Sequence, residues 1–167
     1  MAPHLIHVSP YGGSMESLHP RVRLLWAGRT VVSASVLLGL VVLVDRLFFS
    51  LPLELAAVGW ALLVVLGTVH AAFAHRIWRF GLQDDALFLV RGVLTRRDTS
   101  VPYVRVQHVD TTRGPIERTA GLASVVVYTA GSRGADITIP GLRPERATEL
   151  RERLRDLASE SEATDAV

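Results

Sequence analysis

Two long apolar segments, joined by a short connection, constrain this chain more than any other feature of its sequence. Residues 24–44 contain one charged side chain, Arg29, near the start of the segment, and residues 55–74 contain only the titratable His70. A helix needs ~20 consecutive, mostly apolar residues to cross the hydrocarbon core of a bilayer. Both segments reach this length, and residues 45–54 between them include a proline, aromatic side chains and charges. The sequence therefore predicts a transmembrane helical hairpin over residues 18–76.

Two alternatives to a transmembrane hairpin are weaker. Two buried helices in a soluble protein would need a cover on all sides, and a chain of 167 residues is too short to supply it. A cleaved signal peptide is disfavoured because a second apolar segment follows at once, without a convincing small-residue cleavage site between the two. A hydrophobic content of 49% and a mean hydropathy of +0.31 agree with a membrane protein.

Arginine placement predicts the orientation of the hairpin. Arginines precede the first apolar segment and follow the second, whereas the connection between them contains one, Arg46. Because positively charged flanks stay on the cytoplasmic side, we expect a multi-pass protein of the cell membrane with both termini in the cytoplasm. The residues expected at the membrane–water interface are Trp26, Arg29, Arg76, Trp78 and Arg79.

The two ends of the chain lack an apolar period. Residues 1–17 contain prolines, histidines and a Gly-Gly pair, and we expect them to form a disordered tail. Met15 is a second possible start of translation, so both Met1 and Met15 stay open. Residues 159–167 are acidic and small, and we expect a second disordered tail there.

Residues 77–158 show the pattern of a separate β-rich domain. Short runs rich in strand-forming residues alternate with turns that contain glycine or proline. In the run 103–111, a period of two places Val104, Val106 and His108 on one face, which makes His108 a sheet-packing residue. The predicted strands cover residues 87–91, 93–101, 103–111, 122–129 and 135–139.

A helix is expected to complete this domain. Pro144 suits the first helical turn, and apolar residues then recur at intervals of three and four, at Ala147, Leu150, Leu154 and Leu157. The predicted fold class is α+β: an N-terminal two-helix transmembrane hairpin is followed by an antiparallel β-sandwich or barrel capped by a C-terminal helix.

Six sequence motifs, in the same order, resemble the bacterial pleckstrin-homology (PH) family of YdbS-like membrane proteins, and the resemblance covers roughly residues 18–157, including the two-helix hairpin. The motifs are Leu82–Leu87, Arg91–Arg97, Val101–Asp110, Gly114–Ala123, Tyr128–Gly131 and Ile139–Leu142. The resemblance implies a PH-like fold of two packed antiparallel sheets with a C-terminal helix. It also implies a partner, because members of the family often accompany a longer membrane protein that carries several PH-like domains.

The sequence offers no constellation that points to catalysis. It has no cysteine, and all 18 basic residues are arginine, so thiolate and lysine chemistry are excluded. Nucleotide-binding and hydrolase motifs are missing, and His70 and His75 lie five apart, off the spacing that places two ligands on one helical face. A net charge of +2 gives no reason to expect nucleic acid as a partner. We expect no enzyme, no cofactor and no metal.

Two binding functions and an unrecognised enzymatic one remain. The first is a non-catalytic scaffold or partner-binding module at the cytoplasmic membrane face, with self-association as the alternative to a related membrane protein. The second is a reader of anionic lipid headgroups, although the first hairpin, at Asp84 and Asp85, is acidic and would repel phosphates. The residues expected to contact a partner or a lipid are Arg96, Arg97, Arg105 and Arg118, whose guanidinium groups suit carboxylates and phosphates alike.

Overall fold

The computed structural model describes residues 14–48, 52–130 and 136–165, which divide into two compact units. One unit is the hairpin, Pro20–Arg76, and the other combines the described residues up to His19 with those from Ile77 onward. Most of the N-terminal tail lies outside the described residues. The second unit is therefore built from both sides of the hairpin.

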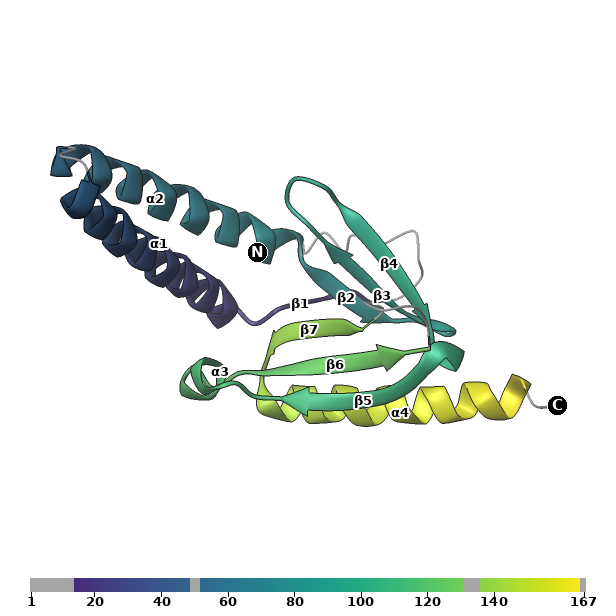
Figure 1. Cartoon of the computed structure of the whole chain (residues 1–167). Helices are drawn as coiled ribbons and strands as arrows, with labels where there is room; N and C mark the ends of the chain where they lie inside the picture. The colour runs from purple at the N-terminus through teal and green to yellow at the C-terminus, as the bar shows by residue number, and fades with distance from the viewer. Residues whose placement is uncertain (1–13, 49–51, 131–135, 166–167) are drawn as a thin grey trace, which may run out of the picture. The chain divides into compact units, whose positions relative to one another are not determined.

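The hairpin consists of α1 (Arg21–Phe48) and α2 (Leu53–Ile77), which lie side by side in Figure 1. The indole Nε1 of Trp60 donates a hydrogen bond of 3.2 Å to Oγ of Ser35. Thr30 packs against Gly67, where a side chain would collide with its methyl group. Small residues thus permit a close approach of the two helices.

The helices present an apolar surface to their surroundings. Only 6% of the most apolar window of each helix is buried, and leucine and valine side chains are exposed along both. The hydroxyl of Thr68 donates to the carbonyl of Val64 at 2.8 Å, which satisfies a polar group that lipid could not. Length, composition and exposure all fit two transmembrane helices.

The other unit contains two antiparallel sheets. The first has the order β1 (Glu16–Ser17), β2 (Arg79–Leu82), β3 (Ala86–Arg91) and β4 (Arg97–Pro102). The second has the order β5 (Val106–Thr112), β6 (Ala123–Thr129) and β7 (Ile137–Leu142). A 3₁₀ turn, η1 (Tyr103–Arg105), joins the sheets, and a short helix, α3 (Pro115–Thr119), joins β5 to β6. Among the described residues the sheets do not form a closed barrel, and the predicted α+β class with two antiparallel sheets is confirmed.

The C-terminal helix α4 (Pro144–Asp165) packs along β5 and β6, as Figure 1 shows. Three residues of this helix, Ala147, Leu150 and Leu154, are fully buried. The predicted apolar stripe therefore faces the core. The helix continues past Ala158 to Asp165, where we expected a disordered tail, because alanine and glutamate in this stretch favour helix over coil.

Strand β1 differs from the sequence prediction, which assigned residues 1–17 to a disordered tail. Glu16 pairs with Phe80 and Ser17 pairs with Arg79, so the segment before the hairpin forms the edge of the first sheet. Leu18 is 1% exposed, and the amide of His19 donates to the carbonyl of Gly141 at 2.9 Å. A strand of two residues has no detectable sequence period, and these long-range contacts are what order it.

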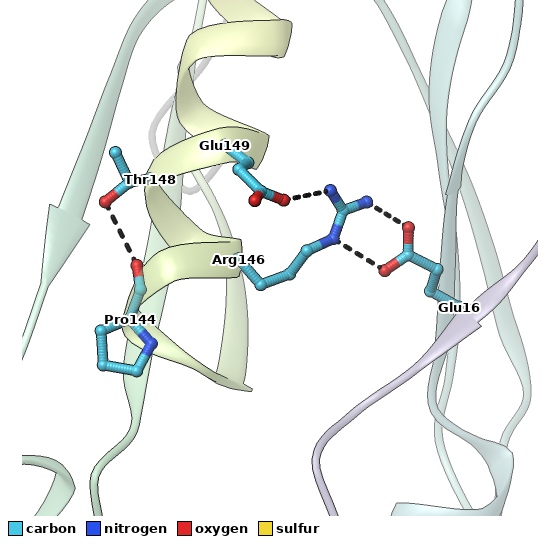
Figure 2. A network of polar contacts seen from close by, with 5 residues as sticks. All are labelled: Glu16, Pro144, Arg146, Thr148 and Glu149. Atoms are coloured by element: carbon cyan, nitrogen blue, oxygen red, sulfur yellow. Dashed lines mark hydrogen bonds and ion pairs between the residues drawn. The ribbon is translucent and has the colours of Figure 1, made fainter.

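An ion pair ties the same segment to α4 (Figure 2). Nε of Arg146 donates to a carboxylate oxygen of Glu16 at 3.1 Å, a second guanidinium nitrogen binds the other oxygen, and Nη1 reaches Glu149 at 3.1 Å. The hydrogen bonds to Glu16 raise the pKa of Arg146 above its usual value. The two parallel hydrogen bonds give the ion pair a defined geometry in addition to its electrostatic attraction.

The run 103–111 is another point where the structure departs from the predicted strand. Residues 103–105 form η1, and the register of β5 shifts between Val106 and His108. Tyr103 and Val109 are therefore buried, whereas Val104 and His108 are exposed. The prediction that His108 packs within the sheet is wrong, because a 3₁₀ turn and a bulge interrupt the period of two.

Replacement of Leu154 by alanine should destabilise the β-rich unit by about 2–5 kcal/mol, because the side chain is fully buried and leaves a cavity. Thermal unfolding of the detergent-solubilised full chain measures the change. Arg155→Ala, at the next and exposed position of α4, is the control and should leave the transition nearly unchanged. An unchanged transition for Leu154→Ala would show that α4 does not close the core.

Glu16→Gln should lower the free energy of unfolding by about 0.5–1 kcal/mol, since the ion pair is partly exposed to water. Amide hydrogen exchange at residues 16–19 should accelerate, because the ion pair helps to hold β1 in place. Glu149→Gln also removes a carboxylate next to Arg146 but leaves β1 untouched. Equal exchange at residues 16–19 in the two variants would contradict this role of Glu16.

Candidate functional site

A shallow groove between β5 and the C-terminal half of α4 is the candidate functional site. It has a volume of about 160 Å³. Its lining is mainly polar, with Gln107 and His108 on the strand and Arg155, Ser159 and Glu162 on the helix. Val106, Val109 and Ala158 form the floor of the groove and are buried. The groove therefore offers hydrogen-bonding and charged groups around a small apolar base.

Strand β5 contributes main-chain hydrogen-bonding groups to this groove as well as side chains. In the strand order β5-β6-β7, β5 is an outer strand, and in the described part of the chain no further strand pairs with its other edge. The register shift between Val106 and His108 lies in this stretch. Bulges of this kind occur often at sheet edges and re-aim side chains.

His108 is held in place at the groove by two neighbours. Its Nε2 lies 2.8 Å from a carboxylate oxygen of Asp110, and its ring lies 6.0 Å from that of Tyr128 on β6. These contacts fix the imidazole beside the strand edge. Among the described residues, no group of three acidic or histidine side chains is placed to hold a metal ion.

The four predicted contact arginines are exposed but do not form one patch. Arg96 and Arg97 lie at the turn between β3 and β4, where Nε of Arg96 binds Asp98 at 3.0 Å. Arg105 ends η1, directly before the groove, and Arg118 lies in α3, beyond the other end of β5. Only Arg105 adjoins the groove, and roles for all four remain proposals.

The predicted membrane-interface residues lie at or near the outer ends of α1 and α2. Trp26 is half-buried and Arg29 exposed in α1, while Arg76 is exposed near the end of α2. Trp78 is only 8% exposed and meets the edge of the Phe80 ring at a centroid distance of 6.5 Å. Nη1 of Arg79 donates to the carbonyl of Trp78 at 3.0 Å. Interfacial roles for these residues are still predictions.

Two polar side chains inside the β-rich unit have structural partners. The hydroxyl of Tyr103 donates to the carbonyl of Gln83 at 2.7 Å, and burial raises the pKa of Tyr103 to about 12. Glu117 accepts the amide of Gly114 at 2.9 Å and the hydroxyl of Ser124 at 2.6 Å. Asp84 and Asp85 are exposed at their turn, as expected. These groups stabilise turns, and none of them lines the groove.

Comparison with known proteins agrees with this architecture. The family model described as "Bacterial PH domain" matches residues 29–158. The chain is 31% identical over 140 residues to "UPF0699 transmembrane protein YdbS" of Bacillus subtilis (strain 168), a match that covers 80% of this chain and 86% of the relative. No solved structure gives a significant match.

The two-sheet fold with its C-terminal helix is thus that of a bacterial PH domain joined to a transmembrane hairpin. The chain belongs to the bacterial PH-domain family of YdbS-like transmembrane proteins. The resemblance noted in the sequence is confirmed, and so are the membrane character and the fold class.

The groove itself was not found from the sequence. Its residues come from β5, from the end of the predicted domain at Arg155 and Ala158, and from Ser159 and Glu162 in the part of α4 that we expected to be disordered. The bulge that exposes Gln107 and His108 has no local signature. A helix prediction extended beyond Ala158 would have brought Ser159 and Glu162 next to the sheet.

The stability of the β-rich unit should fall as the pH rises from about 10 to 12. The folded-state pKa of Tyr103 is raised above that of the unfolded chain, so its stabilising contribution is complete below pH ~10 and is lost as the pH rises through the folded pKa. Denaturant unfolding across this range measures the effect. Tyr103→Phe should weaken the pH dependence, and an equally steep dependence in that variant would contradict the assignment.

Proposed function

We propose that this protein is a membrane-anchored, non-catalytic binding module that captures an extended segment of another membrane protein along β5. The observation that carries the proposal is the position of the groove, beside a strand whose outer edge has no partner strand among the described residues. An extended segment can add to such an edge through main-chain hydrogen bonds, while neighbouring pockets select its side chains.

The polar lining of the groove indicates what kind of segment would fit. Arg155 and the nearby Arg105 favour acidic side chains and outnumber the one lining carboxylate, Glu162, while Gln107 and Ser159 offer neutral hydrogen bonds. Arginine binds carboxylates in a forked geometry, which gives direction as well as attraction. The segment we propose is therefore extended and carries at least one acidic residue.

The membrane anchor supports binding to a membrane partner. Strand β1 precedes α1 and its neighbour β2 follows α2, and this pairing supports a hairpin with both outer ends on one side of the membrane. The excess of arginine at these ends supports the cytoplasmic side. Restriction to a thin layer raises the effective concentration of the domain toward other proteins in the same membrane.

The partner we propose is a longer membrane protein with several PH-like domains, as the family resemblance suggested. Self-association is the alternative, because the same edge could pair with a second copy. Headgroup reading through a joint site of Arg96, Arg97, Arg105 and Arg118 is less well supported, since Arg105 and Arg118 lie beyond opposite ends of β5.

Site-specific photo-crosslinking from native membranes tests the proposal. A photoreactive amino acid at Gln107 reports on the β5 edge, and one at Thr138 on β7, also exposed, reports on the opposite edge of the same sheet. We expect a defined adduct from position 107 and little from position 138. Ser159→Trp, which fills the groove, should reduce that adduct about tenfold, equivalent to ~1.4 kcal/mol of binding.

The charge of the groove gives a matched control for this experiment. Arg155→Glu should weaken the adduct, whereas Arg153→Glu, the same change at an exposed position outside the groove, should not. An adduct with a second copy of the chain would identify self-association. Equal adducts from positions 107 and 138, or insensitivity to Ser159→Trp, would refute binding at the β5 edge.

A further inference from the structure

The two ends of the first sheet differ in charge. At one end, the turn between β2 and β3 contains Asp84 and Asp85. At the other, the turn between β3 and β4 contributes Arg96 and lies between Arg91 and Arg97. Asp98 is the acidic residue at this basic end, where it binds Arg96. The sheet is thus polarised along its strands, with a net positive charge at the turn of residues 92–96.

The register shows which end of the sheet is joined to the membrane helices. Ser17, the last residue of β1, pairs with Arg79, the first residue of β2, and Arg79 pairs with Val90. One residue further along β3, Arg91 pairs with Arg97, and the turn of residues 92–96 projects beyond that pair. The basic turn is therefore at the end where the chain leaves β1 for α1 and enters β2 from α2.

Helix length and chain connectivity lead us to expect this end of the sheet close to the bilayer surface. Helix α2 has 25 residues and is thus about 37 Å long, compared with a hydrocarbon core of about 30 Å. On this length we expect its last residue, Ile77, to lie in the headgroup layer. Only Trp78 separates it from Arg79, a span of at most about 7 Å of chain.

The turn itself is built to present an apolar side chain. Leu94 is 94% exposed, the highest value among the exposed large hydrophobic residues that the structure describes. Gly92 has a φ of +100°, and a Cβ there would collide with the carbonyl oxygen of Thr95, so the tight turn requires glycine. A fully exposed leucine on a turn of defined geometry is available for contact with an apolar surface.

The arginine pair at the base of the turn points to an anionic partner. Arg91 and Arg97 lie directly opposite each other on one face of the sheet, an arrangement that destabilises a strand pair by charge repulsion. Phosphate oxygens between or beside the two guanidinium groups would remove that repulsion. Exposed apolar and basic residues together match the headgroup region of an anionic membrane.

We propose that the β3–β4 turn is a second membrane contact of this protein, in which Leu94 enters the interface of the bilayer that holds the hairpin. Arg91, Arg96 and Arg97 then bind the phosphates of anionic lipids around it. This contact is independent of the β5 groove and fixes how the β-rich unit faces the membrane.

Fluorescence quenching in nanodiscs tests this contact on the full chain. The chain contains no cysteine, so Thr95→Cys and Asp85→Cys each accept a single environment-sensitive fluorophore at opposite ends of the sheet. The discs contain phosphatidylglycerol and a lipid with a nitroxide at the headgroup. We expect several-fold stronger quenching at position 95 than at position 85. Leu94→Ser and Arg96→Glu/Arg97→Glu should each reduce the difference.

Three results would overturn the proposal. The first is equal quenching at positions 95 and 85. The second is equal quenching at position 95 in discs of phosphatidylglycerol and of phosphatidylcholine, which would remove the role of anionic lipid. The third is shielding of position 95 only in discs that contain two copies of the chain, which would assign the turn to a protein contact. None of these outcomes affects the crosslinking from β5.

Discussion

The pairing of β1 with β2 is the constraint on which the rest of this structure depends. Because these strands are hydrogen-bonded neighbours, the whole transmembrane hairpin is an insertion between two adjacent strands of a soluble-type sheet. The domain does not simply follow the membrane anchor in the sequence, because its first sheet takes β1 from before α1 and β2 from after α2.

A strand of two residues could not supply this constraint alone. The burial of Leu18, the bond from the His19 amide to Gly141 and the ion pair of Glu16 with Arg146 connect the same short segment to β7 and α4. These contacts join residues far apart in the chain, which normally costs chain entropy. The hairpin reduces that cost, because two antiparallel helices bring residues 20 and 76 to the same end of their unit.

The sequence was informative where structure repeats locally. Apolar length predicted both membrane helices, and spacings of three and four predicted the buried face of α4, including Leu150 and Leu154. It was misleading where a local pattern is interrupted. Because of the 3₁₀ turn at Tyr103 and the bulge after Val106, His108 is exposed and does not lie on the packed face that the sequence predicted. No local signal could predict β1, since its stability comes from Phe80, Gly141 and Arg146.

The same distinction explains why the arginines were only partly interpretable. Residue type identified them as suitable for anions, but only the register shows that Arg97 faces Arg91, and only the fold separates Arg105 from Arg118. Side-chain chemistry can be read from the sequence, whereas the grouping of side chains depends on strand pairing.

The two proposed contacts support each other physically. A single flexible connection would leave the domain free to rotate at the membrane, and any partner would have to restrict that motion on binding. Two chain connections and a lipid-bound turn at the same end of the first sheet would restrict it in advance. The β5 edge belongs to the second sheet, so it would stay accessible while the turn is in lipid. Because preorganisation lowers the entropic cost of association, a shallow groove of about 160 Å³ could then bind a membrane partner that it would hold only weakly in solution.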